Sequence, residues 1–322
     1  WKEYFWKFIK DNFDKPWKWY YLSTNPNITM DIVLAHPNEY WCWHSLSQNT
    51  NITFDIVRAH PNKPWDWYGL SNNPNITFDN VLAYPDKHWN WSGLSRNPNI
   101  TFDIVLAHPN KPWNWDWLSH NPNITFDIVI AHPEISWNWI GLSRNPTITF
   151  DIVLAYPNKP WHWGGLSYNT NVTLDIVLAY PNKPWNWEGL SLNPHITFDF
   201  VLANLNKPWN WDWLSTNPII TIAIVETHPD KPWDWGYLSS NPNIPFDYIL
   251  AHPDKDWNWY NLSRNSFYKV KQNFVEKRYK EYLSAYRIQQ YWNSAISIPT
   301  NPICQRKIKR DYEKYAKGIG LN

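Results

Sequence analysis

Histidine and aspartate residues recur at fixed positions of this chain, and both types serve in metal binding and acid–base catalysis. The histidines, spaced by 24 residues or a multiple of 24, are His36, His60, His108, His132, His228 and His252. The equivalent position elsewhere holds Tyr84, Tyr156, Tyr180 or Asn204. Because a metal ligand would not be exchanged so freely for Tyr or Asn, we predict no metal site. A polar residue near the C-terminus of a helix explains the pattern better.

The aspartates form a second regular series, which would make an acidic ladder if all its members pointed the same way. They are Asp31, Asp55, Asp79, Asp103, Asp127, Asp151, Asp175, Asp199 and Asp247. Each follows a Thr or Pro by two residues, so we interpret them as carboxylates in the first turn of a helix, where the helix dipole favours them. The sequence has no glycine-rich phosphate loop, no His-Glu-x-x-His and no plausible nucleophile triad. We therefore predict that the protein is not an enzyme and uses no cofactor.

These residues are positioned by a strict repeat. Eleven Trp-x-Trp triplets follow one another every 24 residues, with no insertion or deletion, and begin at Trp17, Trp41, Trp65, Trp89, Trp113, Trp137, Trp161, Trp185, Trp209, Trp233 and Trp257. A constant period of this length indicates a repeat architecture, in which each unit packs only on its neighbours. We predict a capping helix over residues 1–16, with Trp6 off its apolar face, a repeat array over 17–265, and a basic helical cap or tail over 266–322. In that tail a longer helix should cover the last repeat, Pro299 and Pro302 should break it, and residues 304–317 should form a final basic helix.

Residues 97–120 show what one unit should look like. Thr101 is a good N-cap, Phe102, Val105 and Leu106 share a helical face, and Pro109 should stop the helix. A second helix is expected to start at residues 110–112, Asn-Lys-Pro, because Pro suits a first helical turn. Trp113 and Trp115 would then lie on opposite sides of that helix, facing the preceding and the following unit.

The fold class predicted is all-α, an elongated right-handed α-solenoid of eleven short helix pairs with helical caps at both ends. The expected core includes Trp113, Trp115, Trp137, Trp139, Trp161, Trp163, Leu118, Leu142, Val105 and Val129. Loss of a central Trp should then cost more than loss of Trp17 near the end. A β alternative rests on the alternating Ile100, Phe102 and Ile104. It is disfavoured because Asn-Gly and Asp-Gly turns are missing and Gly is scarce.

Charge divides the chain unevenly. Residues 1–266 hold 17 basic and 24 acidic residues, whereas residues 267–322 hold 12 basic and 4 acidic ones. The basic tail makes nucleic acid a possible partner, less favoured than protein because a solvated helix explains the charge as well. Two cysteines are too few for a disulfide framework, which favours a reducing compartment over secretion. No apolar run approaches the length of a membrane span.

The string Asn-Pro-Asn-Ile-Thr-Phe-Asp-Ile-Val, followed by Asn-Lys-Pro-Trp-Asn-Trp and Leu-Ser, recurs through residues 17–265. It resembles tandem repeats in proteins of giant DNA viruses of amoebae, the mimivirus relatives. The resemblance implies a viral repeat protein, found in the virion or in the cytoplasm of the infected cell. It carries over no active-site residues.

Two positions vary while the frame stays constant: the third and seventh residues after the first Trp of each triplet, which we call the variable stripe. Its candidate partner-binding residues are Tyr68, Asn72, Ser92, Arg96, Asp116, His120, Ile140, Arg144, Tyr168, Glu188 and Asp212. Residues four apart share a helical face, and repeat scaffolds present binding surfaces in this way. We therefore predict a scaffold that binds a protein partner. Neutral drift of a solvent face, single-stranded nucleic-acid binding by stacked Trp, and self-assembly into a filament or lattice remain alternatives.

Overall fold

The computed structural model describes residues 1–297 and 300–318, and the regular secondary structure in those residues is entirely α-helical. The chain forms two compact units, Trp1–Tyr268 and Lys269–Asn322. In the first unit, short helices follow one another in pairs, and each pair spans one 24-residue repeat. The predicted all-α solenoid of helix pairs is confirmed.

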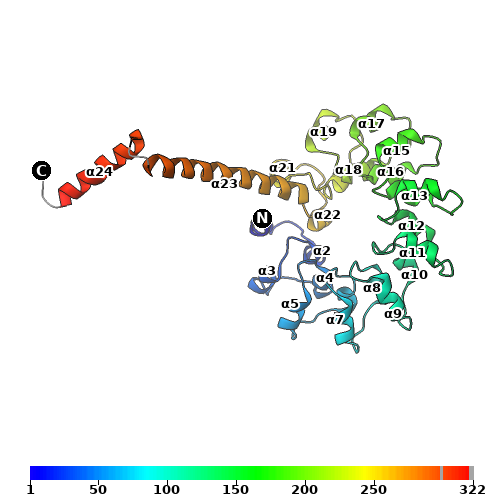
Figure 1. Cartoon of the computed structure of the whole chain (residues 1–322). Coiled ribbons are helices and arrows are strands. Elements are labelled where there is room, and N and C mark those ends of the chain that lie inside the picture. The colour runs from blue at the N-terminus through cyan, green and yellow to red at the C-terminus, as the bar shows by residue number, and fades with distance from the viewer. Residues whose placement is uncertain (298–299, 319–322) are drawn as a thin grey trace. The chain divides into compact units, whose positions relative to one another are not determined.

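The odd-numbered helices form the outer layer of the first unit (Figure 1). They are α1 (Lys2–Asp11), α3 (Met30–Ala35), α5 (Phe54–Ala59), α7 (Phe78–Ala83), α9 (Phe102–Ala107), α11 (Phe126–Ala131), α13 (Phe150–Ala155), α15 (Leu174–Ala179), α17 (Phe198–Ala203), α19 (Ile222–Thr227) and α21 (Phe246–Ala251).

The even-numbered helices form the inner layer, and most of them pack against the inner helix of the next pair. They are α2 (Trp19–Thr24), α4 (Trp43–Gln48), α6 (Trp67–Leu70), α8 (Trp91–Arg96), α10 (Trp115–Leu118), α12 (Trp139–Arg144), α14 (Trp163–Tyr168), α16 (Trp187–Leu192), α18 (Trp211–Thr216), α20 (Trp235–Leu238) and α22 (Trp259–Arg264).

Side-chain caps set where these helices begin. The Thr101 hydroxyl accepts from the Ile104 amide at the start of α9, as predicted, and α9 ends before Pro109. The prediction for the second helix is wrong: α10 begins at Trp115, because the Asn114 side chain caps it by accepting from the Trp117 amide. Trp113 therefore lies in the connecting loop. It contacts Trp91 of the preceding pair, whereas Trp115 contacts Trp137 of the following pair, as predicted.

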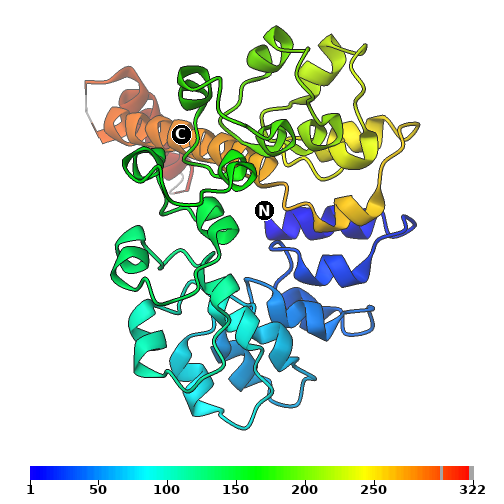
Figure 2. The same cartoon turned by 90° about the vertical axis from the view of Figure 1, so that its right-hand side faces the viewer.

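The first unit closes on itself. Within the array, the Asn49 side chain donates to the Ser23 and Asn25 carbonyls of the preceding pair. The Asn25 side chain makes the same two bonds to the carbonyls of Ser263 and Asn265, both at 2.9 Å. Helix α2 packs on α22 as most inner helices pack on their neighbours, and Figure 2 shows the two ends of the unit side by side. The expected elongated array is therefore wrong, because the rotation between pairs brings the eleventh back to the first.

Helix α1 is the outer helix of this closing pair. Phe8 stacks on Phe246 of α21, with ring centroids 4.1 Å apart. On the other side Trp6 contacts His36 and Trp41, the same two contacts that Phe78 makes to the following pair. Sequence spacing placed Trp6 off the apolar face, yet it is buried. Helix α1 therefore has a packed neighbour on each side, whereas a helix that covers the end of an open array has a packed neighbour on one side only.

The second unit holds two longer helices, α23 (Tyr268–Ser297) and α24 (Pro302–Gly318). Both were expected, as a long helix after the array and a basic one near the C-terminus. The helix break predicted at Pro299 lies outside the described residues, and the expected covering of the last repeat by α23 stays a prediction. In the part of the chain that the structure describes, no helix is both apolar and long enough to cross a membrane.

Candidate functional site: the inner-helix stripe

The Trp residues make a continuous belt around the closed unit. The second Trp of each triplet meets the first Trp of the next edge-to-face, as Trp91 meets Trp113 with centroids 5.0 Å apart. The last such contact joins Trp259 to Trp17 across the seam, at 4.8 Å. Of the core residues predicted, Trp113, Trp137, Trp161, Leu118, Leu142, Val105 and Val129 are buried, whereas Trp115, Trp139 and Trp163 are half-buried. Leu106, expected on the same face as Val105, is exposed.

The buried Ser and Asn side chains that recur in every repeat form a series of hydrogen bonds between pairs, which we call the polar spine. The Ser71 hydroxyl donates to the Trp67 carbonyl and accepts from the Asn90 amide of the next pair. The fully buried Asn121 side chain donates to the carbonyls of Ser95, Asn97 and Ile100 in the preceding pair. Buried backbone groups that lose such partners are costly. The spine therefore explains why Asn and Ser hold their repeat positions so strictly.

The recurring histidine is part of the packing. The His108 ring lies 4.7 Å from Phe78 of the preceding pair, and Tyr156 lies 4.7 Å from Phe126 in the same way. The His108 carbonyl accepts from the indole N–H of Trp113. His and Tyr interchange here because either ring packs on the aromatic side chain of the preceding pair. Asn204 is the exception, and its side chain donates to the Phe200 carbonyl instead. Among the described residues, no three His, Cys, Asp or Glu side chains group as metal ligands.

The variable stripe lies on the inner helices, except for Asn72 and His120, which follow the ends of α6 and α10, and most of its members are exposed to solvent. Of the predicted members, Tyr68, Asn72, Arg96, Asp116, Ile140, Arg144, Glu188 and Asp212 are exposed, whereas Ser92, His120 and Tyr168 are half-buried. The stripe thus stands apart from the Trp belt and the polar spine, which supply the stability.

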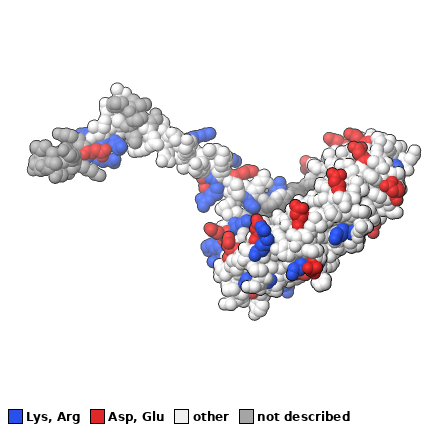
Figure 3. All heavy atoms as spheres, turned by 60° about the horizontal axis from the view of Figure 1, so that its bottom comes forward, with Lys and Arg blue, Asp and Glu red and all other residues white. Residues whose placement is uncertain are grey.

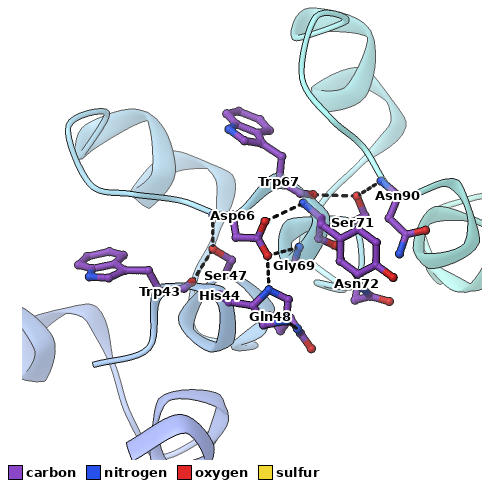
Figure 4. A network of polar contacts seen from close by, with 11 residues as sticks. Trp43, His44, Ser47, Gln48, Asp66, Trp67, Gly69, Ser71, Asn72 and Asn90 are labelled. Carbon is purple, nitrogen blue, oxygen red and sulfur yellow. Dashed lines mark hydrogen bonds and ion pairs between the residues drawn. The ribbon is translucent and has the colours of Figure 1, made fainter. Parts of the chain in front are cut away.

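In several repeats the third residue after the first Trp reaches the cap residue of the following inner helix. Asp116 accepts from the side-chain amide of Asn138 at 3.1 Å, and Ser92 accepts from the side-chain amide of Asn114 at 3.1 Å. Figure 4 shows the version of this contact at α4 and α6, where His44 pairs with Asp66 and Gln48 hydrogen-bonds the other ring nitrogen of His44. These stripe residues are therefore linked to the start of the following inner helix.

The seventh residue after the first Trp is linked to the glycines of the next helix. The Tyr168 ring passes Gly189, where an added Cβ would come within 3.1 Å of it, and reaches Trp213 two pairs on. Burial, and then the Glu188 carboxylate, raise the pKa of Tyr168. Where a Trp replaces the glycine, the preceding residue lies over it instead, as the Arg96 guanidinium lies over Trp117. The exchange between Gly and Trp at this place was visible in the sequence, but the contact behind it was not.

Aromatic side chains gather on the stripe at the seam. Tyr20 lies between Tyr21 and His44, and His44 lies next to Tyr68. Tyr21 and Tyr260 meet across the seam at 4.1 Å. The hydrogen bond that Tyr21 gives to Tyr260 raises the pKa of Tyr21 and lowers that of Tyr260.

Charged side chains of both signs are scattered over the face seen in Figure 3, with wide uncharged areas between them.

The comparisons with known proteins add no relative. No family model matches the chain, and neither a curated protein nor a solved structure is significantly similar to it.

Proposed function

We propose that the protein is a non-enzymatic repeat scaffold that binds a protein partner through the variable stripe. The observation that carries this proposal is the separation of roles on one helix. Each repeat gives the Trp, Leu and Ser of its inner helix to a constant frame, whereas the two residues of the variable stripe differ from one repeat to the next and are mostly exposed.

The composition of the stripe supports a protein partner. It combines exposed Tyr68 and Ile140 with charged Arg144, Glu188 and Asp212, a mixture of apolar anchors and polar groups of both signs that is typical of protein interfaces. Tyr and Arg are also the residue types that dominate interface energetics. The resemblance to repeat proteins of giant viruses of amoebae makes the virion or the infected cell the place to look for the partner.

The test is affinity capture from an extract of infected amoebae with the wild-type protein and two variants. The stripe variant carries serine at Tyr68, Arg96, Ile140, Arg144, Glu188 and Asp212, because Ser92 already occupies this stripe. The matched control carries glutamine at six exposed outer-helix residues: Leu34, Leu82, Leu106, Ile130, Leu154 and Leu178.

We expect one protein to be captured by the wild type and the control and to be lost with the stripe variant, with at least tenfold lower recovery. Equal recovery by the stripe variant, or loss with the control alone, would place the binding surface elsewhere. Recovery of nucleic acid that disappears with added salt would favour the nucleic-acid alternative.

A further inference from the structure

An open groove of about 960 Å³ lies next to the seam. Two kinds of residue line it: the aromatic residues Tyr237, Trp259 and Tyr260, and the polar or charged residues Asp234, Asp256, Asn258 and Lys18. Its volume falls within the range of about 300–1,000 Å³ that is usual for small-molecule sites.

Gly236 contributes to the groove because it has no side chain over the cap of the next inner helix. Gly164 holds the same repeat position, but the groove at Gly236 is also lined by Pro16 and Lys18 from across the seam. In four other repeats the third residue after the first Trp contacts the cap residue of the next inner helix, as Glu188 accepts from the Asn210 side-chain amide at 3.5 Å. Gly236 has no side chain to do so, and a Cβ placed on it would lie 3.9 Å from the Asn258 amide nitrogen. The Asn258 cap amide therefore faces the groove.

The lining matches one ligand chemistry. Tyr237 and Tyr260 keep 39% and 38% of their surface exposed, so both offer ring area to a ligand. Flat apolar ring faces pack against the C–H faces of a pyranose, while carboxylates accept from hydroxyl groups and an amide both donates and accepts. We propose that this groove binds a short neutral oligosaccharide.

Nucleic acid fits the groove less well. A stacking platform for single strands needs a basic channel that follows the phosphates. Among the residues that line this groove, Lys18 is opposed by the carboxylates of Asp234 and Asp256. A neutral, hydroxyl-rich ligand avoids that repulsion and uses the same carboxylates as hydrogen-bond acceptors.

The test is isothermal titration of the full chain with three neutral trisaccharides: cellotriose, maltotriose and triacetylchitotriose. We expect at least one of them to bind the wild type with a Kd in the millimolar range or below. Tyr260→Ala, which removes a ring, and Gly236→Ile, which fills the groove, should each weaken that binding at least tenfold. Ile140 already occupies the position equivalent to Gly236 in α12, so isoleucine suits the helix; the Asp234 carboxylate, 3.0 Å from the added Cβ, has only to shift slightly.

Tyr68→Ala is the matched control, because Tyr68 has the same repeat position as Tyr260, is 56% exposed and does not line the groove. It should bind the trisaccharide as the wild type does, and all variants should melt within a few degrees of the wild type. Three results would each overturn the proposal: no binding of any trisaccharide, unchanged affinity of both groove variants, or an equal loss with Tyr68→Ala.

Discussion

Replacing Trp17 or Trp137 by alanine is expected to lower the free energy of unfolding of the whole first unit, Trp1–Tyr268, by similar amounts, about 3–5 kcal/mol. Both side chains are buried, and each meets the edge of a Trp from the preceding pair: Trp259 for Trp17 and Trp115 for Trp137. Each also donates its indole N–H to a backbone carbonyl five residues earlier. Because the unit is closed, position along the chain no longer decides how much packing a Trp has.

The measurement is urea unfolding followed by circular dichroism at 222 nm, with Trp292→Ala as control. Trp292 is 50% exposed on α23, outside the first unit, so replacing it should leave the urea midpoint of the first unit unchanged. In an open array, by contrast, Trp17→Ala would fray only the first repeats and shift the transition much less than Trp137→Ala. If Trp17→Ala lowered the free energy of unfolding clearly less than Trp137→Ala does, the result would favour the open array.

Deleting residues 1–11 is expected to destabilise the repeat unit more than any single Trp substitution. The deletion removes four buried side chains, Phe5, Trp6, Phe8 and Ile9. Each contributes about 1.5–3 kcal/mol of apolar burial. It also uncovers Phe246, which stacks on Phe8. The outer layer would then have a gap at the seam, with α21 and α3 each missing a neighbour.

Differential scanning calorimetry measures this effect. We expect a melting temperature at least ten degrees lower and a smaller unfolding enthalpy, because the pairs beside the seam lose packing on both sides. Leu106→Ala is the control: it removes an exposed outer-helix side chain and should shift the transition by a degree or two at most. If the deleted protein melts like the wild type, α1 does not complete the ring.

Much of the fold could be predicted because the same residue pattern recurs in eleven repeats. Thr101 and Pro109 bound the outer helix by local rules of capping and chain geometry, and those rules were sufficient. The start of the inner helix was placed too early because Pro112 and Asn114 are both acceptable near a helix start. The choice between them depends on the bond from the Trp117 amide to the Asn114 side chain, which spacing alone does not reveal.

Closure could not be predicted, since it depends on a small rotation between pairs that accumulates over the whole array. No residue pattern within one repeat reports that angle. The register of the seam is the product of many such steps, and it brings the Ser263 hydroxyl to the Lys18 amide at 3.0 Å. The groove beside Gly236 depends on closure too, because Lys18 and Asp256 come together only there.

Chemical cross-linking across the seam tests closure most directly. Two double-cysteine proteins would be made in a background with Cys42 and Cys304 replaced by serine: one with cysteines at positions 20 and 260, the other at positions 20 and 140. All three positions are exposed and share one place in the repeat. Treated at low concentration with a short bis-maleimide, the 20/260 protein should give an internally cross-linked monomer in high yield and the 20/140 protein should not. Failure of the 20/260 pair to cross-link in the monomer would contradict the closed ring.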